Sequence, residues 1–506
     1  VGADKYLWRL ILLFIESVTV RSSKQSSEEQ DVLEEDDKSS GPVTTSDLEF
    51  LTSLCEKFTG SQLLQCFHQT LTYALQLPEE KQDGHAVQTS KVLLNFEDAS
   101  TDVEIFNVAY HTAKQLRHFK FALAFILNHL VSSQHLVEQL AEAEPAAFLT
   151  DYQCFMETIL QFISQVTQSH DRHREKSSNR FWRILLHKSH DLLDHLVNLL
   201  PDSMIMNVVL GLMNHSLPLV LRRAVELLNT KLQQYKEGLT ASQANMLLPV
   251  TTKLLSVVQQ CLLKGAKTGV RDEDIITGQT ALYSLKVLCR ILGQKNHKQF
   301  IEVLKVCVKI LSEYHNNGMV SASSMLCIAE VISCIKTHSI EHLGKFMPLI
   351  ISQLQSEDIT SHEVLLLAAV TSLQKIIESV PLFLSPYLLD ITVQICKVSS
   401  MISEQAESHK PVVSQKVKLI CTTLATVTPI RTFLPVLEKS FIALQDRMAS
   451  CADCAMSMLK DHIVKMSRED LTTFSQDLLK FFFSCFDLRT TQSEISESDL
   501  DVIEGR

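Results

Sequence analysis

Residues that interrupt helices are scarce in this chain. Only 13 glycines and 12 prolines occur among 506 residues, whereas 45% of the chain is hydrophobic. This composition favours helices along almost the whole length. Positive charge is also in deficit, with 47 Lys and Arg against 58 Asp and Glu and a net charge of -11. The balance argues against non-specific nucleic-acid binding by the whole chain, but it is compatible with a local basic patch.

The features of a secreted or membrane protein are also missing. No signal peptide is evident, and the 13 cysteines are spread along predicted helices rather than gathered in a disulfide framework. We therefore expect reduced, buried thiols in an intracellular protein. The longest uncharged stretch, 203–221, is divided by Asn214, His215 and Pro218 into two helices, so no membrane span is expected.

The sequence lacks the motifs of common enzyme classes. It contains no GxSxG and no HExxH, and Lys264–Gly269 lacks the spacing and the preceding strand of a phosphate-binding loop. His187, His190 and Asp194 lie at helical spacing, but no third ligand stands at a fixed distance. We predict no enzyme activity and no cofactor.

One CxxC motif, Cys451 and Cys454, requires a separate judgement. Zinc needs four ligands, and only His462 and Cys485 lie near this pair in the sequence. On a helix both cysteines share a face with Met458, which favours core packing, and we predict no metal site.

A recurring phrase organises the chain: apolar residues, a proline, then a run of Leu, Ile and Val at helical spacing. The proline falls at Pro249, Pro348, Pro386 and Pro435, and in a version without proline Glu302 takes its position. We call these five positions the repeat slots. A period of about forty to fifty residues with two helices per unit is typical of a HEAT-type α-solenoid. We therefore predict an elongated all-α fold of stacked antiparallel helix pairs, without β-sheet.

The composition along the chain divides it into five parts. We expect the end of a preceding helical repeat at 1–20, a disordered acidic and Ser-rich loop at 21–46, and divergent helical repeats at 47–200, with helices resuming at 47–77 and 101–141. A HEAT-repeat solenoid follows at 201–487, and an acidic tail at 488–506.

The densest cluster of positive charge lies between two predicted helices. It comprises Arg172, Arg174, Lys176, Arg180 and Arg183 beside Trp182. Arginines with an adjacent aromatic ring can contact RNA phosphates and stack on bases. The competing interpretation is a solvated loop between repeats with Trp182 packed into the next repeat, because Asp171 and Glu175 dilute the patch.

The repeat phrases resemble one particular family. The segments that carry the resemblance are Leu217–Leu228, Phe383–Leu389, Thr432–Glu438 and Phe474–Phe486 with the acidic tail. They resemble the HEAT repeat-containing protein 1 family, most clearly over about 200–487, and the chain is expected to be a piece from the C-terminal half of a longer member. The resemblance implies a non-catalytic nucleolar scaffold of the small-subunit processome, which acts in pre-ribosomal RNA processing and supports RNA polymerase I transcription. It also implies protein partners and contact with pre-ribosomal or small nucleolar RNA.

Two other functions are compatible with such a solenoid. One is a nuclear transport receptor of the importin kind, and the other is a cytosolic regulatory scaffold. Nucleolar localisation favours the first interpretation, and staining of the nuclear rim favours the transport receptor.

Overall fold

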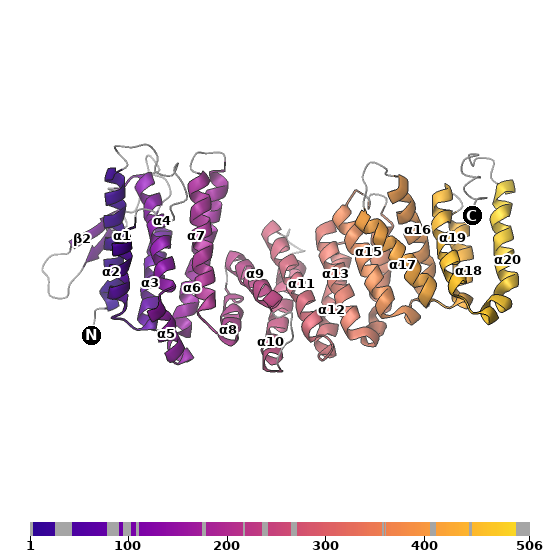
Figure 1. Ribbon diagram of the computed structural model, residues 1–506, viewed down its shortest axis with the longest axis horizontal. Coiled ribbons are helices and arrows are strands. Elements are labelled where there is room, and N and C mark those ends of the chain that lie inside the picture. Colours follow the sequence, from indigo (N-terminus) through magenta and orange to yellow (C-terminus); the bar gives the residue numbers. More distant parts are fainter. Residues whose placement is uncertain are drawn as a thin grey trace. The chain divides into compact units, whose positions relative to one another are not determined.

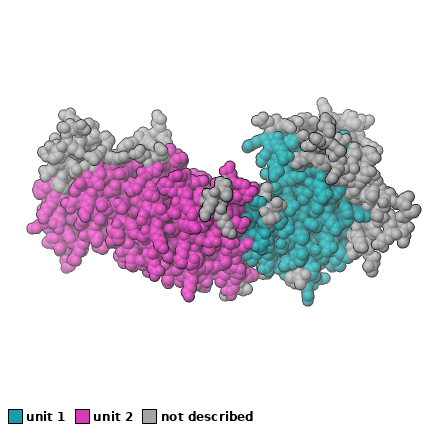
Figure 2. All heavy atoms as spheres, turned by 180° about the vertical axis from the view of Figure 1, so that it is seen from behind, with its two compact units in different colours: residues 1–228 teal, residues 229–506 magenta. Residues whose placement is uncertain are grey.

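The computed structural model describes most of the chain. The described residues are 4–25, 43–77, 91–94, 103–107, 111–174, 179–215, 218–234, 241–264, 271–356, 359, 361–404, 411–444 and 448–491. Nearly all of them are helical, which confirms the all-α prediction (Figure 1). The contacts divide the chain into unit 1, Val1–Leu228, and unit 2, Asn229–Arg506 (Figure 2).

Unit 1 consists mainly of helices that pack side by side. They are α1 (Asp4–Gln25), α2 (Thr45–Cys55), α3 (Gly60–Gln76), α4 (Ala113–Val131), α5 (Gln134–Glu142), α6 (Pro145–Arg172), α7 (Asn179–Asn198), α8 (Asp202–Leu212) and the start of α9 (Pro218–Gln234). The long helices pack as α1 on α3, α3 on α6, and α4 on α7. Three of them begin with a capping box, in which Thr44, Thr59 or Thr112 accepts a bond from the backbone N–H three residues later.

A short hairpin interrupts the helices of unit 1. Strand β1 (Lys91–Leu94) pairs antiparallel with β2 (Val103–Asn107), and both strands contact α1. The predictions of no β-sheet and of a helix from residue 101 are therefore wrong here. The segment Val103–Phe106 is short and rich in β-branched and aromatic residues, and such a run favours a strand over a helix.

Unit 2 stacks its helices in two layers. One layer contains α11 (Asp272–Leu292), α13 (Gly318–Ile335), α15 (Glu363–Ser379), α17 (Pro411–Val427) and α19 (Met448–Lys465). The other contains α10 (Ala241–Val258), α12 (His297–Glu313), α14 (Leu343–Leu354), α16 (Leu388–Glu404), α18 (Ile430–Ala443) and α20 (Arg468–Thr491), and Figure 1 shows the helices of unit 2 following one another in chain order. Each helix packs on the next helix of its own layer, as stacked repeats require.

The repeat phrase of the sequence marks one of these layers. Its five slots lie on or just before α10, α12, α14, α16 and α18, so the predicted register is confirmed for unit 2. Pro249, Pro348 and Pro435 stand inside their helices rather than before them, which differs from the expected order of proline and then helix. The side chain two residues before each slot is at most 1% exposed, and these residues are Leu247, Phe300, Phe346, Leu384 and Phe433.

Irregular segments separate some helices of unit 2. A π-helix, η3 (Gln259–Lys264), extends α10, and a 3-10 helix, η5 (Lys336–His342), leads into α14. Two further 3-10 turns, η7 (Pro381–Phe383) and η8 (Ser385–Tyr387), precede α16. Lys336 has a φ of 45°, so the chain turns sharply between α13 and η5.

Within the described part of the chain, two segments are long and apolar enough to cross a membrane by length and composition. They are Ala244–Leu263 and Gly318–Leu354, and 44% and 67% of their apolar windows are buried inside the protein. The second segment contains two separate helices, α13 and α14, whose apolar residues form the repeat core. Core packing therefore accounts for its hydrophobicity.

The predicted boundaries stand as follows. Helix α1 continues to Gln25 and α2 begins at Thr45, so both ends of the loop expected at 21–46 are helical, and 26–42 lies outside the described residues. Helix α20 continues to Thr491, and the rest of the tail also lies outside them. The contact division follows Leu228, so the boundary expected at residues 200 and 201 stays a prediction about repeat type.

Candidate interaction surfaces

The predicted basic strip lies where α6 ends and α7 begins. Arg172 is in the last turn of α6, Arg174 follows it, and Arg180 and Arg183 are in the first turns of α7. All four side chains are exposed, whereas Lys176 lies outside the described residues. The structure thus brings four of the five predicted cationic residues to one connection.

Trp182 does not belong to this exposed strip: its burial agrees with the competing interpretation of a packed tryptophan and corrects the prediction that it takes part in RNA contact. Its side chain is 1% exposed, and its ring lies 5.4 Å from Phe181 and 5.5 Å from His173. The buried face of α7 includes Phe181, Trp182, Leu185 and Ser189, which recur at helical spacing. Because this face packs into the core, a nucleic-acid base cannot stack on the indole, and any phosphate contact depends on the cationic side chains of the strip.

The histidines near this strip lie in separate environments. The Nε2 atom of His187 is 3.8 Å from the Asp191 carboxylate, and Nδ1 of His195 is 2.9 Å from the Ser132 hydroxyl. Burial and the positive charge of Arg223 lower the pKa of His190. Among the described residues, no group of three or more His, Cys, Asp or Glu could hold a metal ion.

The CxxC cysteines lie in the repeat core. Cys451 is 1% and Cys454 9% exposed, and the Cys454 sulfur is 3.6 Å from that of Cys421 on α17. A hydrogen bond to Cys454, together with burial, raises the pKa of Cys421. His462 is held elsewhere, because its Nδ1 bonds the Ala425 carbonyl. These contacts are those of core thiols.

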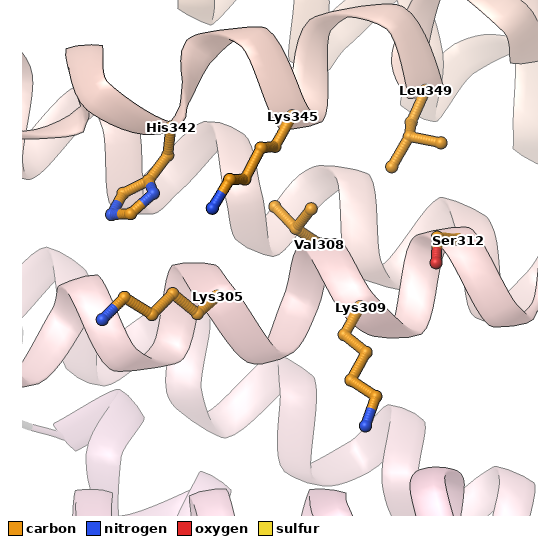
Figure 3. Close-up of a pocket in the computed structure, with 7 residues that line it drawn as sticks. All are labelled: Lys305, Val308, Lys309, Ser312, His342, Lys345 and Leu349. Atoms are coloured by element: carbon orange, nitrogen blue, oxygen red, sulfur yellow. The ribbon is translucent and has the colours of Figure 1, made fainter.

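A second cationic surface, not predicted from the sequence, lies between α12 and α14. It is a groove of about 470 Å³, lined by Lys305, Val308, Lys309, Ser312, His342, Lys345 and Leu349 (Figure 3). Figure 3 shows Lys305, His342 and Lys345 gathered at one end, while the Lys309 amine points away. Val308 and Leu349, both half-buried, supply apolar surface farther along. We call this surface the basic groove.

The charges of the basic groove are partly compensated on α12. Lys305 Nζ lies 2.7 Å from the Glu302 carboxylate, and Lys309 Nζ lies 3.8 Å from that of Glu313. Both pairs are within one helix and exposed, so each contributes about 0.3–0.5 kcal/mol. Lys345 has no ion-pair partner among the residues that the structure describes.

Sequence reasoning missed the basic groove because its walls are far apart in the chain. Lys305 follows its repeat slot by one helical turn, and Lys345 precedes the next slot by one turn. The two become neighbours because α12 and α14 stack in one layer. Comparison of exposed lysines in adjacent repeats, aligned on the slots, was the signal that could have found them.

A family model and similar known sequences point to the same family. A family model described as "HEATR1-like, HEAT repeats" matches residues 1–198, which include the part predicted as divergent repeats. HEAT repeat-containing protein 1 of Homo sapiens is 34% identical over 99% of this chain and 22% of its own length. The protein of the same name from Danio rerio is 31% identical over 100% of this chain and 23% of its own length. This chain therefore spans less than a quarter of these relatives.

The similarity to solved structures is weaker. A crystal structure of importin beta in an ammonium sulfate condition has 13% sequence identity and a TM-score of 0.44, and the match covers 94% of this chain and 62% of that chain. Kap121p bound to Nup53p has 12% identity and a TM-score of 0.32 over 92% of this chain and 49% of that chain.

Proposed function

Because this chain belongs to the HEAT repeat-containing protein 1 family, we propose that it is part of a non-catalytic scaffold that acts in ribosome biogenesis. The relationship over 99% of the chain to the human protein is the observation that carries this proposal. The two layers of unit 2 are consistent with a scaffold, since stacked helices present long surfaces rather than an enclosed site.

In this proposal the whole protein acts in processing of the small-subunit pre-ribosomal RNA and supports transcription by RNA polymerase I. It works in the nucleolus, among protein partners of the small-subunit processome. A protein several times longer than this chain can contact several partners at once, so that many weak contacts add up to a stable association.

The basic strip is the surface that we assign to RNA. Arg172, Arg174, Arg180 and Arg183 are exposed at one connection, and Lys176 belongs to the same segment. Guanidinium groups contact phosphates irrespective of base sequence, and this suits a buried Trp182 that leaves no ring for stacking. The contact would position pre-ribosomal or small nucleolar RNA without selecting its sequence.

The cellular role is tested by depletion and replacement of the full-length protein. We expect depletion to cause accumulation of unprocessed small-subunit precursor RNA, measured by northern blotting, and the intact protein to restore processing and to stain nucleoli. Normal processing after depletion, or staining of the nuclear rim, would contradict ribosome biogenesis and favour a transport receptor. Cytosolic staining would favour a regulatory scaffold.

The RNA contact is tested separately, with all five cationic residues of the strip replaced by Glu. We expect RNA crosslinking to fall. The slope of log binding constant against log salt concentration should become shallower by about 0.7–0.9 for each phosphate that the variant no longer binds. A control variant makes the same charge change at five other exposed cations, namely Arg271, Lys295, Lys298, Arg431 and Lys439. Equally weak crosslinking by both variants would show only a general charge effect.

A further inference from the structure

The basic groove combines features that a solvated helix face does not require. Its helices use their other faces for the core, where Phe300 and Leu304 of α12 and Phe346 and Ile350 of α14 are all fully buried. The groove side of both helices is therefore available to another molecule. Between the α12 and α14 walls the structure leaves a groove of about 470 Å³ (Figure 3).

One end of the basic groove is fixed by a local contact. The ring of His338, on η5, stacks on His297 at the start of α12, with centroids 4.2 Å apart and planes 13° apart. Ser339 is also buried, and its hydroxyl donates to the Lys336 carbonyl. The histidine stack joins η5 to α12, and the Ser339 bond lies within η5, so His342 at the end of η5 is held at the wall of the groove. A preformed site of this kind loses little entropy when it binds a ligand.

The charge of the groove selects an anionic occupant. Lys305 approaches from α12 and Lys345 from α14, and His342 lies beside them. Glu302 offsets part of the charge of Lys305, whereas no carboxylate among the described residues pairs with Lys345. In a chain with a net charge of -11, this is a local site of opposite sign, and it attracts carboxylates or phosphates at short range.

The apolar lining distinguishes between the two kinds of anion. Val308 and Leu349 are aliphatic, and among the described lining residues only the ring of His342 could stack on a base. An RNA backbone would contact the lysines but leave both aliphatic side chains without a partner. A peptide with carboxylates and an aliphatic residue would satisfy both parts, and about 470 Å³ is enough for a few side chains.

We propose that the basic groove between α12 and α14 docks a short acidic segment of a partner protein that carries an aliphatic anchor residue. Its carboxylates pair with Lys305 and Lys345, and its aliphatic side chain packs on Val308 and Leu349. The proposal rests on the scaffold role of the chain, but not on ribosome biogenesis.

The test is fluorescence anisotropy with the full 506-residue chain and a labelled peptide in which glutamates flank a central leucine. We expect saturable binding that weakens at least tenfold in Lys305→Glu/Lys345→Glu. Replacing the leucine of the peptide by serine, or Leu349 of the protein by serine, should each weaken it severalfold. The matched control, Arg431→Glu/Lys439→Glu, makes the same charge change on α18 of the same layer and should bind as the unaltered chain does.

Three results would overturn the proposal. One is the absence of saturable binding, and another is equal binding by the groove variant and the control variant. The third is an oligouridylate that binds more tightly than the peptide and no longer binds after the same two substitutions, since the groove would then be an RNA contact. Circular dichroism and thermal unfolding of each variant show whether weaker binding reflects misfolding. None of these outcomes depends on precursor-RNA processing in cells, so failure here and failure of the proposed cellular role are distinguishable.

Discussion

At the scale of single residues, Glu330 carries the most connected charge in the described part of unit 2. Its carboxylate accepts two hydrogen bonds from Arg290 of α11, at 3.1 and 2.9 Å, and one from Lys375 of α15, at 2.6 Å. Its side chain is only 6% exposed. Burial by itself would raise the pKa of Glu330, but the hydrogen bonds from Arg290 and Lys375 lower it below the usual value. One carboxylate thus links three successive helices of one layer.

We predict that Glu330→Gln destabilises the protein by about 1–3 kcal/mol at pH 7, because it leaves Arg290 and Lys375 without their anionic partner. A lowered pKa in the folded state means that this stability is present above the pKa of an unfolded glutamate, about 4.3, and is lost as the pH falls through the folded value. Urea unfolding at pH 7 and below pH 4 should therefore show a difference that shrinks in acid. Glu302→Gln, in an exposed pair, is the control and should change little.

Residue-scale reasoning from sequence found the basic strip but left open whether Trp182 is exposed beside it or packed in the core. The density of positive charge from Arg172 to Arg183 was enough to predict an exposed cluster, since charged side chains are rarely buried. Whether the adjacent indole faces solvent or core depends on which side of α7 meets its neighbours. That is a property of the packed repeat, and one sequence does not contain it.

At the scale of elements, the residue at the repeat slot and the residue two positions before it have different environments. Phe433 is fully buried, whereas Pro435, two residues later, is exposed on α18. The helix thus tolerates a proline because its ring lies at the surface, although one backbone hydrogen bond is lost. The buried position before the slot contributes the packing that holds the helix in its layer.

We predict that Phe433→Ala lowers the free energy of unfolding by about 3–5 kcal/mol, because it leaves a cavity in the core. The neighbouring Pro435→Ala should leave it unchanged or raise it by up to about 2 kcal/mol, since a gain in helix propensity of about 3 kcal/mol exceeds the roughly 0.4–1 kcal/mol lost through a more flexible unfolded chain. Chemical denaturation of both variants measures the contrast. Similar effects of the two substitutions would show that the slot does not mark the boundary between core and surface.

Helices were predictable at this scale, and the hairpin was not. Stripes of apolar residues at helical spacing predicted a solenoid of helix pairs over 201–487, and the described residues of this range form such pairs. Strands β1 and β2 have four and five residues, which is too short for a clear periodicity. Their pairing also depends on α1, which lies far from them in the sequence.

At the scale of the whole molecule, the chain consists of two units with separate sets of internal contacts. In stacked repeats each repeat contacts mainly the repeats next to it. The stability of a segment is therefore close to the sum of the stabilities of its repeats and of the interfaces between them. The net charge of -11 describes this whole only on average, because the basic strip lies in unit 1 and the basic groove in unit 2. Composition alone therefore hides both cationic surfaces.

We predict that residues 241–506, which begin at the start of α10, fold without the rest of the chain. The expected result is a strongly helical circular dichroism spectrum and a cooperative thermal transition, because the helices of this segment pack on one another. Peptide binding in the basic groove should persist in this fragment. A fragment that is unfolded, or that melts without cooperativity, would show that these repeats depend on residues before 241.

The prolines on one layer of unit 2 have a mechanical consequence. A proline donates no hydrogen bond, so the carbonyls of Asn245, Gly344 and Arg431, four residues before Pro249, Pro348 and Pro435, each lack the usual helical donor. The opposite layer has no proline within its described helices beyond the first residue of α17, and Glu330 ties three of its members together. We hypothesise that the layer with α10, α14 and α18 deforms more easily than the opposite layer, so that unit 2 bends when a partner binds. Faster amide hydrogen exchange in α10, α14 and α18 than in α11, α13 and α15 is the expected signature, and equal exchange in both layers would refute it.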